Sequence, residues 1–293
     1  MIAVNQLTKL YRNGRGVRDL TFTVKEGEVF GYLGPNGAGK TTTIRNLMGF
    51  LRPDCGTCAI NGLDCWEASA GIQRTVGYIP GEIAFFDSMT GTAFLDFLGE
   101  MRGTKHRSRV SALLELFRLD PSERIREMSK GTKQKLAILA ACMHDPGIMV
   151  FDEPSAGLDP LMQDVFVRFI LEEKKRGKTV FISSHNFDEI NRTCDRAGII
   201  RDGFLVDVQD VLALNEKQRR QFIITLSREE DVEKLRNSSL SILKIDGRRM
   251  EIAVQGRPDR FIKTISRVSV EDIELQPMAL ERVFMQYYGP EVK

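Results

Sequence analysis

The sequence lacks a long hydrophobic run. Its best stretches, such as Leu136 to Met143, are less than half of the roughly 18 to 20 apolar residues that a membrane-spanning helix needs. The first residues, MIAVNQLTKLYRNGR, also lack the basic start, apolar stretch and small-residue cleavage site of a secretion signal. We therefore expect a cytoplasmic chain with no direct membrane insertion.

The chain carries little net charge. Its 42 Lys and Arg residues against 40 Asp and Glu residues leave +2, which makes no field for attracting nucleic acid, so no nucleic-acid partner is expected. One basic cluster stands out locally, and it could touch nucleic acid or lipid headgroups. Aromatic residues are not interleaved with it, so a solvated edge is the favoured interpretation. The cluster comprises Arg102, Lys105, His106, Arg107 and Arg109.

Cysteine is scarce. Five cysteines are an odd number in a mid-sized chain without a secretion signal, which favours reduced thiols over a disulfide framework. Cys55 and Cys58, with Cys65 beyond them, invite a zinc interpretation. The chain shows no obvious fourth ligand at zinc-like spacing, so we expect structural cysteines.

What the chain does have is the pattern of an α/β protein. Short apolar runs such as Val29–Leu33, Ile148–Phe151 and Thr179–Ser183 alternate with longer helical patterns, as in βαβ units on a mostly parallel sheet. Between about residues 87 and 144 the strand signals fade and apolar residues recur at helical spacing. The expected fold is a mostly parallel sheet with an inserted helical subdomain, over residues 1–211.

A second pattern follows the polar segment Leu212–Gln221. Its order is βαββαβα, which predicts a small C-terminal α+β domain of ferredoxin-like type over residues 221–293. Asp246-Gly247 is a strong turn between the two central strands. The elements expected are strands Phe222–Leu226, Leu240–Val254 (two) and Val268–Leu275, and helices Glu229–Arg236, Asp259–Arg267 and Ala279–Tyr288.

The strongest motif is a phosphate-binding loop. The run from Gly34 to Thr41 fits G-x-x-x-x-G-K-[ST] in full, with a predicted strand Glu28–Leu33 before it and a predicted helix Thr41–Leu51 after it. Glycines let backbone N–H groups face a phosphate, Lys40 supplies charge to the β- and γ-phosphates, and the Thr41 hydroxyl can ligate Mg²⁺. A ligand-free glycine turn is the structural alternative. The candidate nucleotide-binding residues here are Gly34, Pro35, Asn36, Gly37, Ala38, Gly39, Lys40, Thr41 and Thr42.

Three polar residues follow two other predicted strands. Asp152 and Glu153 end one strand and His185 follows another, and the carboxyl ends of parallel strands meet at the ligand-binding edge of a sheet. Asp152 can hold Mg²⁺, and Glu153 can act as general base on a water that attacks the γ-phosphate. With Lys40 and His185, Glu153 makes the expected catalytic set.

Taken together, the motifs of residues 1 to about 210 resemble the ATP-binding subunits of ABC transporters. Beyond the phosphate loop, Met128–Lys135 is similar to the family signature and Glu153–Pro160 to its D-loop. His185 stands where the family has a switch histidine, and Tyr11 where it stacks an aromatic ring on adenine. The resemblance implies ATP and Mg²⁺ as cofactors.

The resemblance also implies a site shared between two subunits. Two such chains face head to tail, as a homodimer or as a heterodimer with a similar ATPase subunit. Each ATP then lies between the phosphate loop of one subunit and Ser129, Gly131 and Asp159 of the other. The sequence agrees in one respect, because Ser129 is a candidate N-cap for a helix whose N–H groups can meet a γ-phosphate.

The chain departs from the family pattern at two places. Lys130 and Thr132 replace a glycine and the glutamine of the signature, a variant similar to the ATPase subunits of bacterial ABC-2-type exporters. After Val76–Pro80, Gly81 and Glu82 stand where the family has its Q-loop glutamine. Since glycine has no side chain for Mg²⁺ or water, Glu82 is a tentative metal residue.

The function expected is therefore an ATPase whose ATP-driven dimerisation powers a separate polytopic membrane permease, most plainly an exporter, from the inner face of the cell membrane. One alternative is a soluble ABC ATPase acting on ribosomes or DNA. Against it, the chain has one phosphate loop and no long coiled coil between Lys40 and Ser129. A regulatory module that binds ATP without turnover is disfavoured because Glu153 and His185 are both present.

Overall fold

The computed structural model describes residues 1–103, 107–217, 220–254, 258–275 and 285. The chain forms two compact units, Met1–Asp210 and Val211–Lys293. Each has its own β-sheet structure and its own hydrophobic core.

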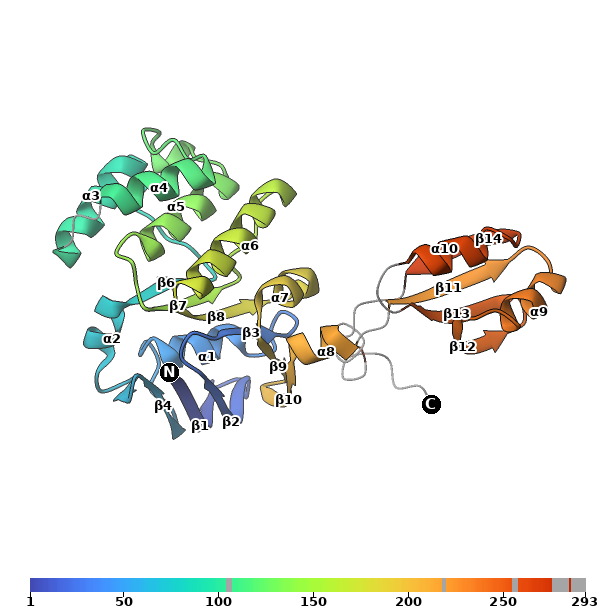
Figure 1. The fold of residues 1–293 in the computed structure, drawn as a ribbon. Helices are drawn as coiled ribbons and strands as arrows, with labels where there is room; N and C mark the ends of the chain where they lie inside the picture. Colours follow the sequence, from blue (N-terminus) through green and yellow to red (C-terminus); the bar gives the residue numbers. More distant parts are fainter. Residues whose placement is uncertain (104–106, 218–219, 255–257, 276–284, 286–293) are drawn as a thin grey trace. The chain divides into compact units, whose positions relative to one another are not determined.

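A six-stranded sheet forms the centre of the first unit (Figure 1). The strand order is β10-β9-β3-β8-β7-β6, in which the five strands β9 to β6 run parallel and β10 is antiparallel at the edge. The mostly parallel sheet predicted from the sequence is thus confirmed. Its strands are β3 (Val29–Leu33), β6 (Val76–Ile79), β7 (Ile148–Asp152), β8 (Thr179–Ser184), β9 (Arg196–Arg201) and β10 (Phe204–Asp210).

A second, antiparallel sheet of order β2-β1-β4-β5 was not expected from the sequence. Its register shifts twice between β1 and β2, and Gln6 and Asp19 adopt positive φ at these irregularities. Such bulges interrupt the strict alternation by which a half-buried strand is found in a sequence. The strands are β1 (Ile2–Leu10), β2 (Gly16–Val24), β4 (Cys55–Ile60) and β5 (Leu63–Asp64).

The hydrophobic core of this unit joins the two sheets. Phe22 of the antiparallel sheet stacks on Phe30 with ring centroids 5.5 Å apart, and Tyr32 and Phe181 extend the aromatic group. All four rings are buried. The helices of the sheet region are α1 (Lys40–Leu47), α2 (Ser69–Thr75), α6 (Pro160–Lys175) and α7 (Phe187–Thr193).

Helices occupy the segment in which strand signals fade. They are α3 (Gly91–Arg102), α4 (Arg107–Phe117), the 3-10 turn η1 (Ile125–Glu127) and α5 (Lys130–Cys142). Thr90 caps α3 by accepting the Ala93 N–H, and Ser129 caps α5 in the same way. Over the part of the chain that the structure describes, no helix has both the length and the apolar composition to cross a membrane.

The second unit is an α+β domain. Its antiparallel sheet has the order β12-β13-β11-β14, and Gly247 takes positive φ in the turn between β12 and β13. Phe222 and Phe261 stack 4.6 Å apart beside its core. The predicted helix Ala279–Tyr288 lies outside the described residues, apart from Met285. The elements are α8 (Val211–Lys217), β11 (Arg220–Leu226), α9 (Glu230–Arg236), β12 (Ser241–Asp246), β13 (Arg249–Val254), α10 (Asp259–Ile265) and β14 (Val270–Leu275).

Candidate functional site

The glycine loop runs from the end of β3 to the start of α1, as the motif requires. Gly39 takes φ 114° as the N-cap of α1, a conformation that favours glycine. A Cβ on Gly39 would also lie 2.6 Å from Cγ1 of Val17. Both the backbone angle and the contact exclude a side chain here, so the loop can lie close against the strand that covers it.

Lys40 begins α1 and is almost fully buried. Its Nζ donates to the carbonyl oxygens of Gly34 at 2.6 Å and Pro35 at 3.2 Å, and it lies 3.0 Å from Oε1 of Glu153. The ammonium is therefore held above the loop, in the position where a lysine neutralises a phosphate.

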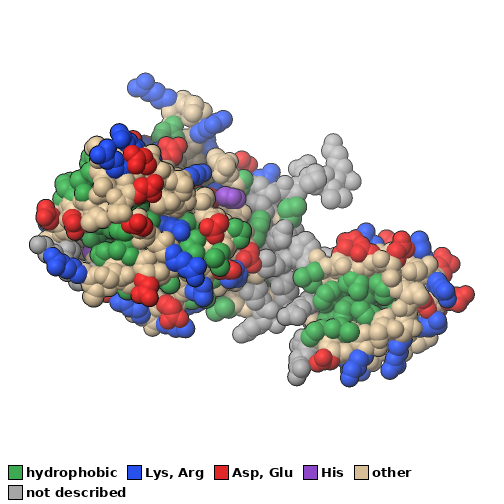
Figure 2. All heavy atoms as spheres, turned by 90° about the horizontal axis from the view of Figure 1, so that it is seen from above, with side chains coloured by type: hydrophobic (Ala, Val, Ile, Leu, Met, Phe, Trp, Pro, Cys, Tyr) green, Lys and Arg blue, Asp and Glu red, His purple; other side chains and the backbone are tan. Residues whose placement is uncertain are grey.

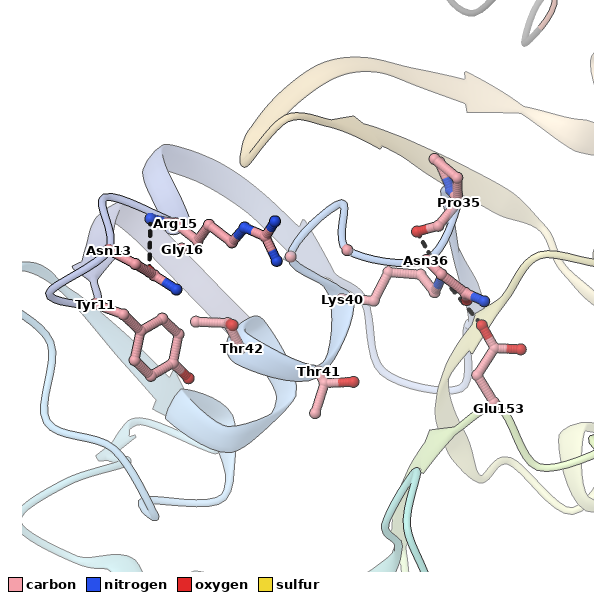
Figure 3. A pocket seen from close by; sticks show the side chains of 12 residues that line it. Tyr11, Asn13, Arg15, Gly16, Pro35, Asn36, Lys40, Thr41, Thr42 and Glu153 are labelled. Carbon is pink, nitrogen blue, oxygen red and sulfur yellow. Dashed lines mark hydrogen bonds and ion pairs between the residues drawn. The ribbon is translucent and has the colours of Figure 1, made fainter.

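A cavity of about 300 Å³ opens over this loop (Figure 3). It brings together residues of the glycine loop, Glu153 from the end of β7, and the turn between β1 and β2. Tyr11 was expected there, whereas Asn13, Arg15 and Gly16 were missed. The lining residues are Tyr11, Asn13, Arg15, Gly16, Pro35, Asn36, Gly37, Gly39, Lys40, Thr41, Thr42 and Glu153.

Glu153 is held in an uncommon backbone conformation. Its φ is 52°, which is rare outside glycine, and its N–H lies 3.1 Å from both the carbonyl and the hydroxyl oxygen of Ser183. Its Oε2 lies 2.7 Å from Nδ1 of His185. The carboxylate thus stands between Lys40 and His185, as a base placed beside a phosphate site would.

Asp152 is buried at the end of β7. Its Oδ1 accepts a hydrogen bond of 2.5 Å from the Ser183 hydroxyl, while its Oδ2 has no hydrogen-bond partner among the described residues. A buried, unpartnered carboxylate oxygen suits a hard cation such as Mg²⁺, which takes oxygen ligands. Burial, and then the nearby Asp152 charge, raise the pKa of the Tyr78 phenol to about 12.

The loop after β6 departs from the family pattern in its geometry as well as in its sequence. A Cβ placed on Gly81 would lie 2.9 Å from Oδ2 of Asp152, too close for a side chain to enter without movement. Glu82 beside it is exposed. Gly81 therefore leaves the free face of the Asp152 carboxylate open.

The signature residues form a separate group. Ser129 caps α5 by accepting the Thr132 N–H at 3.1 Å, and Asp159 caps α6 by accepting the Met162 N–H at 2.9 Å. Gly131 packs against the loop before α6, since a Cβ placed on Gly131 would lie 3.0 Å from the Gly157 carbonyl oxygen. Ser129, Gly131 and Asp159 do not line the cavity over Lys40.

The basic cluster is the expected solvated edge only in part: Arg107 is exposed, whereas Arg109 and Arg102 are engaged by other residues. Arg109 reaches from α4 to the side chain of Glu173 on α6 at 2.8 Å and lies over the Phe169 ring, with a fifth of its side chain exposed. Arg102 donates to the Arg74 carbonyl at 2.9 Å. Lys105 and His106 lie outside the described residues.

The cysteines are all free thiols. Cys55 is exposed, while Cys58 and Cys65 are buried neighbours on β4 and just after β5. A hydrogen bond with Cys58, and then burial, raise the pKa of the Cys65 thiol far above its usual range, which disfavours the thiolate form. Among the described residues, no three metal-binding side chains cluster around them.

The fold and the glycine loop define a class, the P-loop nucleotide-binding proteins. Comparison with known protein families narrows this class to one family, since residues 17–156 match the ABC transporter family. The chain is 35% identical to the ABC transporter ATP-binding protein NatA of Bacillus subtilis over 71% of this chain and 87% of that protein. It is 34% identical to the bacitracin transport ATP-binding protein BcrA of Bacillus licheniformis over 78% of this chain and 75% of that protein.

A solved structure supports the same assignment. The ATP-binding subunit of an ABC transporter superposes with a TM-score of 0.68 at 30% identity, covering 73% of this chain and 92% of that one. The chain therefore belongs to the ABC transporter family, as one of its ATP-binding subunits. The resemblance drawn from the motifs is thereby confirmed.

Proposed function

We propose that this subunit binds ATP with Mg²⁺ and hydrolyses it in a head-to-tail dimer that powers a separate membrane permease. The observation that carries the proposal is that Glu153, which lines the cavity together with Lys40, contacts both Lys40 and His185. A carboxylate between a phosphate-binding lysine and a histidine is suited to in-line attack by water.

Each residue has a distinct task in this proposal. Tyr11 stacks on adenine, and the N–H groups of residues 34–42 hold the phosphates together with Lys40. Thr41 and Asp152 hold Mg²⁺, which neutralises phosphate charge when bound, and Glu82 is not assigned a ligand role. Glu153 accepts the proton of the attacking water. His185 contacts the γ-phosphate and orients Glu153.

A second copy completes the site. Ser129, Gly131 and Asp159 lie away from the cavity of their own chain, yet Ser129 begins a helix of 13 residues whose N-terminus favours anions. In the dimer these residues face the γ-phosphate of the nucleotide held by the partner. One chain alone therefore supplies half of each site.

The permease docks on the helical subdomain. Phe85, Phe86, Phe94 and Phe97 form an aromatic cluster beside α3, with Phe86 56% exposed. Met101, 70% exposed, continues the apolar surface along α3. Such a surface suits a helix of a membrane protein, which supports a location at the inner face of the membrane.

Export is the proposed direction. The run Ser129-Lys130-Gly131 followed by Lys133-Gln134-Lys135 resembles that of ABC-2-type exporters. The similarity to a bacitracin transport ATP-binding protein supports a transport role, in which the permease carries the cargo.

The ATPase domain is proposed to span residues 1–211 and an accessory domain residues 221–293. The order of secondary structure elements and the strand order β12-β13-β11-β14 support a ferredoxin-like accessory domain. This domain exposes Ile262 on α10 and Ile273 and Leu275 on β14, and Figure 2 shows a hydrophobic patch on its surface. Removing residues after Asp210 tests whether it stabilises the dimer, because unchanged dimerisation and ATPase rate would assign it another task.

The proposal is tested with tagged Glu153→Gln protein, captured with ATP from detergent-solubilised cells. The variant is expected to bind ATP, to dimerise and to hydrolyse at least about 100-fold more slowly than wild type, since it lacks the base. A polytopic membrane protein should co-purify with it and not with a Lys40→Ala control. Ribosomes or DNA in its place would assign the chain to the non-transport ABC ATPases, and brisk turnover by Glu153→Gln would remove Glu153 as the base.

A further inference from the structure

We infer that Arg15 is a second phosphate-binding cation of the nucleotide site, reaching the phosphate chain of ATP from the turn between β1 and β2. The inference rests on the proposed ATP site and adds to it a residue outside the phosphate-loop motif. Arg15 lies in the turn between β1 and β2 and was not indicated by the sequence pattern.

The backbone places Arg15 beside the glycine loop. A Cβ on Gly39 would lie 2.6 Å from Val17 and 3.4 Å from the Gly16 carbonyl oxygen, so the first residues of β2 pack directly on the start of α1. Arg15 immediately precedes Gly16. Its α-carbon is therefore close to the N–H groups that the loop offers to phosphate.

The turn that carries Arg15 is ordered by hydrogen bonds on both sides. The Arg15 N–H donates to Oδ1 of Asn13 at 3.1 Å, and its carbonyl oxygen accepts the Tyr11 N–H at 2.8 Å. The Gly14 N–H closes the turn by donating to the Tyr11 carbonyl at 2.8 Å. The same turn thus fixes Tyr11, which marks the adenine end of the cavity, and Arg15.

The side chain of Arg15 extends into the cavity. Figure 3 shows it running from the turn toward the glycine loop, on the side of Thr42 and Lys40. Arg18 on β2 makes contacts within the protein, since its side chain donates to the Gly14 carbonyl and lies over the Phe204 ring. Arg12 belongs to the same turn and is exposed, but it does not line the cavity.

The charges of the cavity leave Arg15 available to a ligand. Lys40 is held by Glu153 and by two carbonyl oxygens. Within the described ranges, no acidic side chain lies within ion-pair distance of Arg15. A guanidinium offers planar, paired donors that match phosphate oxygens, and a nucleoside triphosphate brings more negative charge than one lysine neutralises.

The test compares Arg15→Gln with Arg12→Gln in the full chain, using calorimetric binding of Mg-ATP and of inorganic tripolyphosphate at low salt. Because tripolyphosphate has no base, it reports on phosphate contacts alone. Arg15→Gln is expected to weaken both ligands by about ten-fold, the scale of one charge-assisted hydrogen bond, and to reduce the salt dependence of binding. Arg15→Lys should recover part of the loss, and Arg12→Gln should match wild type.

Tyr11→Ala is the opposite control, since it should weaken ATP and leave tripolyphosphate unchanged. Wild-type affinity of Arg15→Gln for both ligands would overturn the inference. So would a loss confined to ATP, because Arg15 would then act only through the base-binding side of the turn. Failure of the proposed function looks different, since Lys40→Ala would then bind ATP as well as wild type.

Discussion

Gly81 faces the carboxylate of Asp152 so closely that a Cβ on it would lie 2.9 Å from Oδ2. This oxygen is buried and has no hydrogen-bond partner among the described residues, whereas Oδ1 is fixed by the Ser183 hydroxyl. The open approach to Asp152 therefore depends on the absence of a side chain at position 81. The family's glutamine would meet the same oxygen unless the loop moved.

The substitution Gly81→Ala should consequently impair metal use more than nucleotide binding. The added methyl displaces Asp152 from its position, so the Mg²⁺ concentration for half-maximal ATPase activity is expected to rise by about ten-fold, the cost of one disturbed carboxylate contact. ATP affinity without metal should stay within two-fold of wild type by the same reasoning. Glu82→Gln is the matched control, and an unchanged Mg²⁺ requirement in Gly81→Ala would contradict the argument.

The division of the site between two chains makes a complementation test possible. Lys40→Ala removes the phosphate-loop half, and Ser129→Arg removes the signature half. Each variant alone should be nearly inactive. Mixed at equal concentration they should reach about a quarter of the wild-type rate, because about half of the dimers are mixed and each has one intact site of two.

The readout is the ATPase rate of the mixture against each variant alone. Circular dichroism melting of Ser129→Arg controls for the lost helix cap, which costs about 1 kcal/mol. A mixture no more active than its components would mean that Ser129 does not act on the partner's nucleotide.

A buried ion pair joins the helical subdomain to the sheet region. Glu173 of α6, with 3% of its side chain exposed, contacts Arg109 of α4 at 2.8 Å and Arg176 at 2.9 Å. Glu173→Ala leaves Arg109 partly buried without its partner, and it should lower the free energy of unfolding by about 3 kcal/mol. Glu172→Ala, at an exposed neighbouring position, should change it by less than about 0.5 kcal/mol. Urea unfolding of both variants measures the difference, and equal effects would show that the buried pair contributes nothing special.

The phosphate loop could be predicted because the residues that bind phosphate are adjacent in the sequence. Gly37 and Gly39, which take positive φ, lie directly before a lysine and a threonine, and a strand and a helix flank the loop. The carboxylates Asp152 and Glu153 were found for a similar reason, because they directly follow a strongly apolar strand. The local sequence was therefore enough to predict these residues of the site.

Residues that depend on distant partners could not be found in this way. Arg15 becomes part of the site only because Gly39 packs against Val17. The residues around either position in the sequence do not predict this contact. Arg109 was expected in solvent because its neighbours in sequence are basic, yet its partner Glu173 lies far along the chain. The antiparallel sheet could likewise not be predicted, because the register of β1 is irregular at Gln6.

Glu189 gives the structure a pH dependence that can be measured. It lies on α7 four residues after His185, is almost fully buried, and accepts a hydrogen bond of 2.5 Å from the Ser184 hydroxyl. Burial raises the pKa of this carboxyl above its ordinary value of 4.5; the negative charge of Glu153 acts in the same direction, while Ser184, Ser155 and His185 act against it.

Because the folded pKa is raised, the folded state holds this proton more tightly than the unfolded state does. The stabilisation is complete below pH 4.5 and is lost as the pH rises through the folded pKa. Glu189→Gln has no such proton to lose, so the stability of wild type relative to this variant should fall as the pH rises across that range. Urea unfolding at a series of pH values measures this, with Glu172→Gln as the exposed control. A constant difference between wild type and Glu189→Gln at every pH would show that the carboxyl titrates alike in both states.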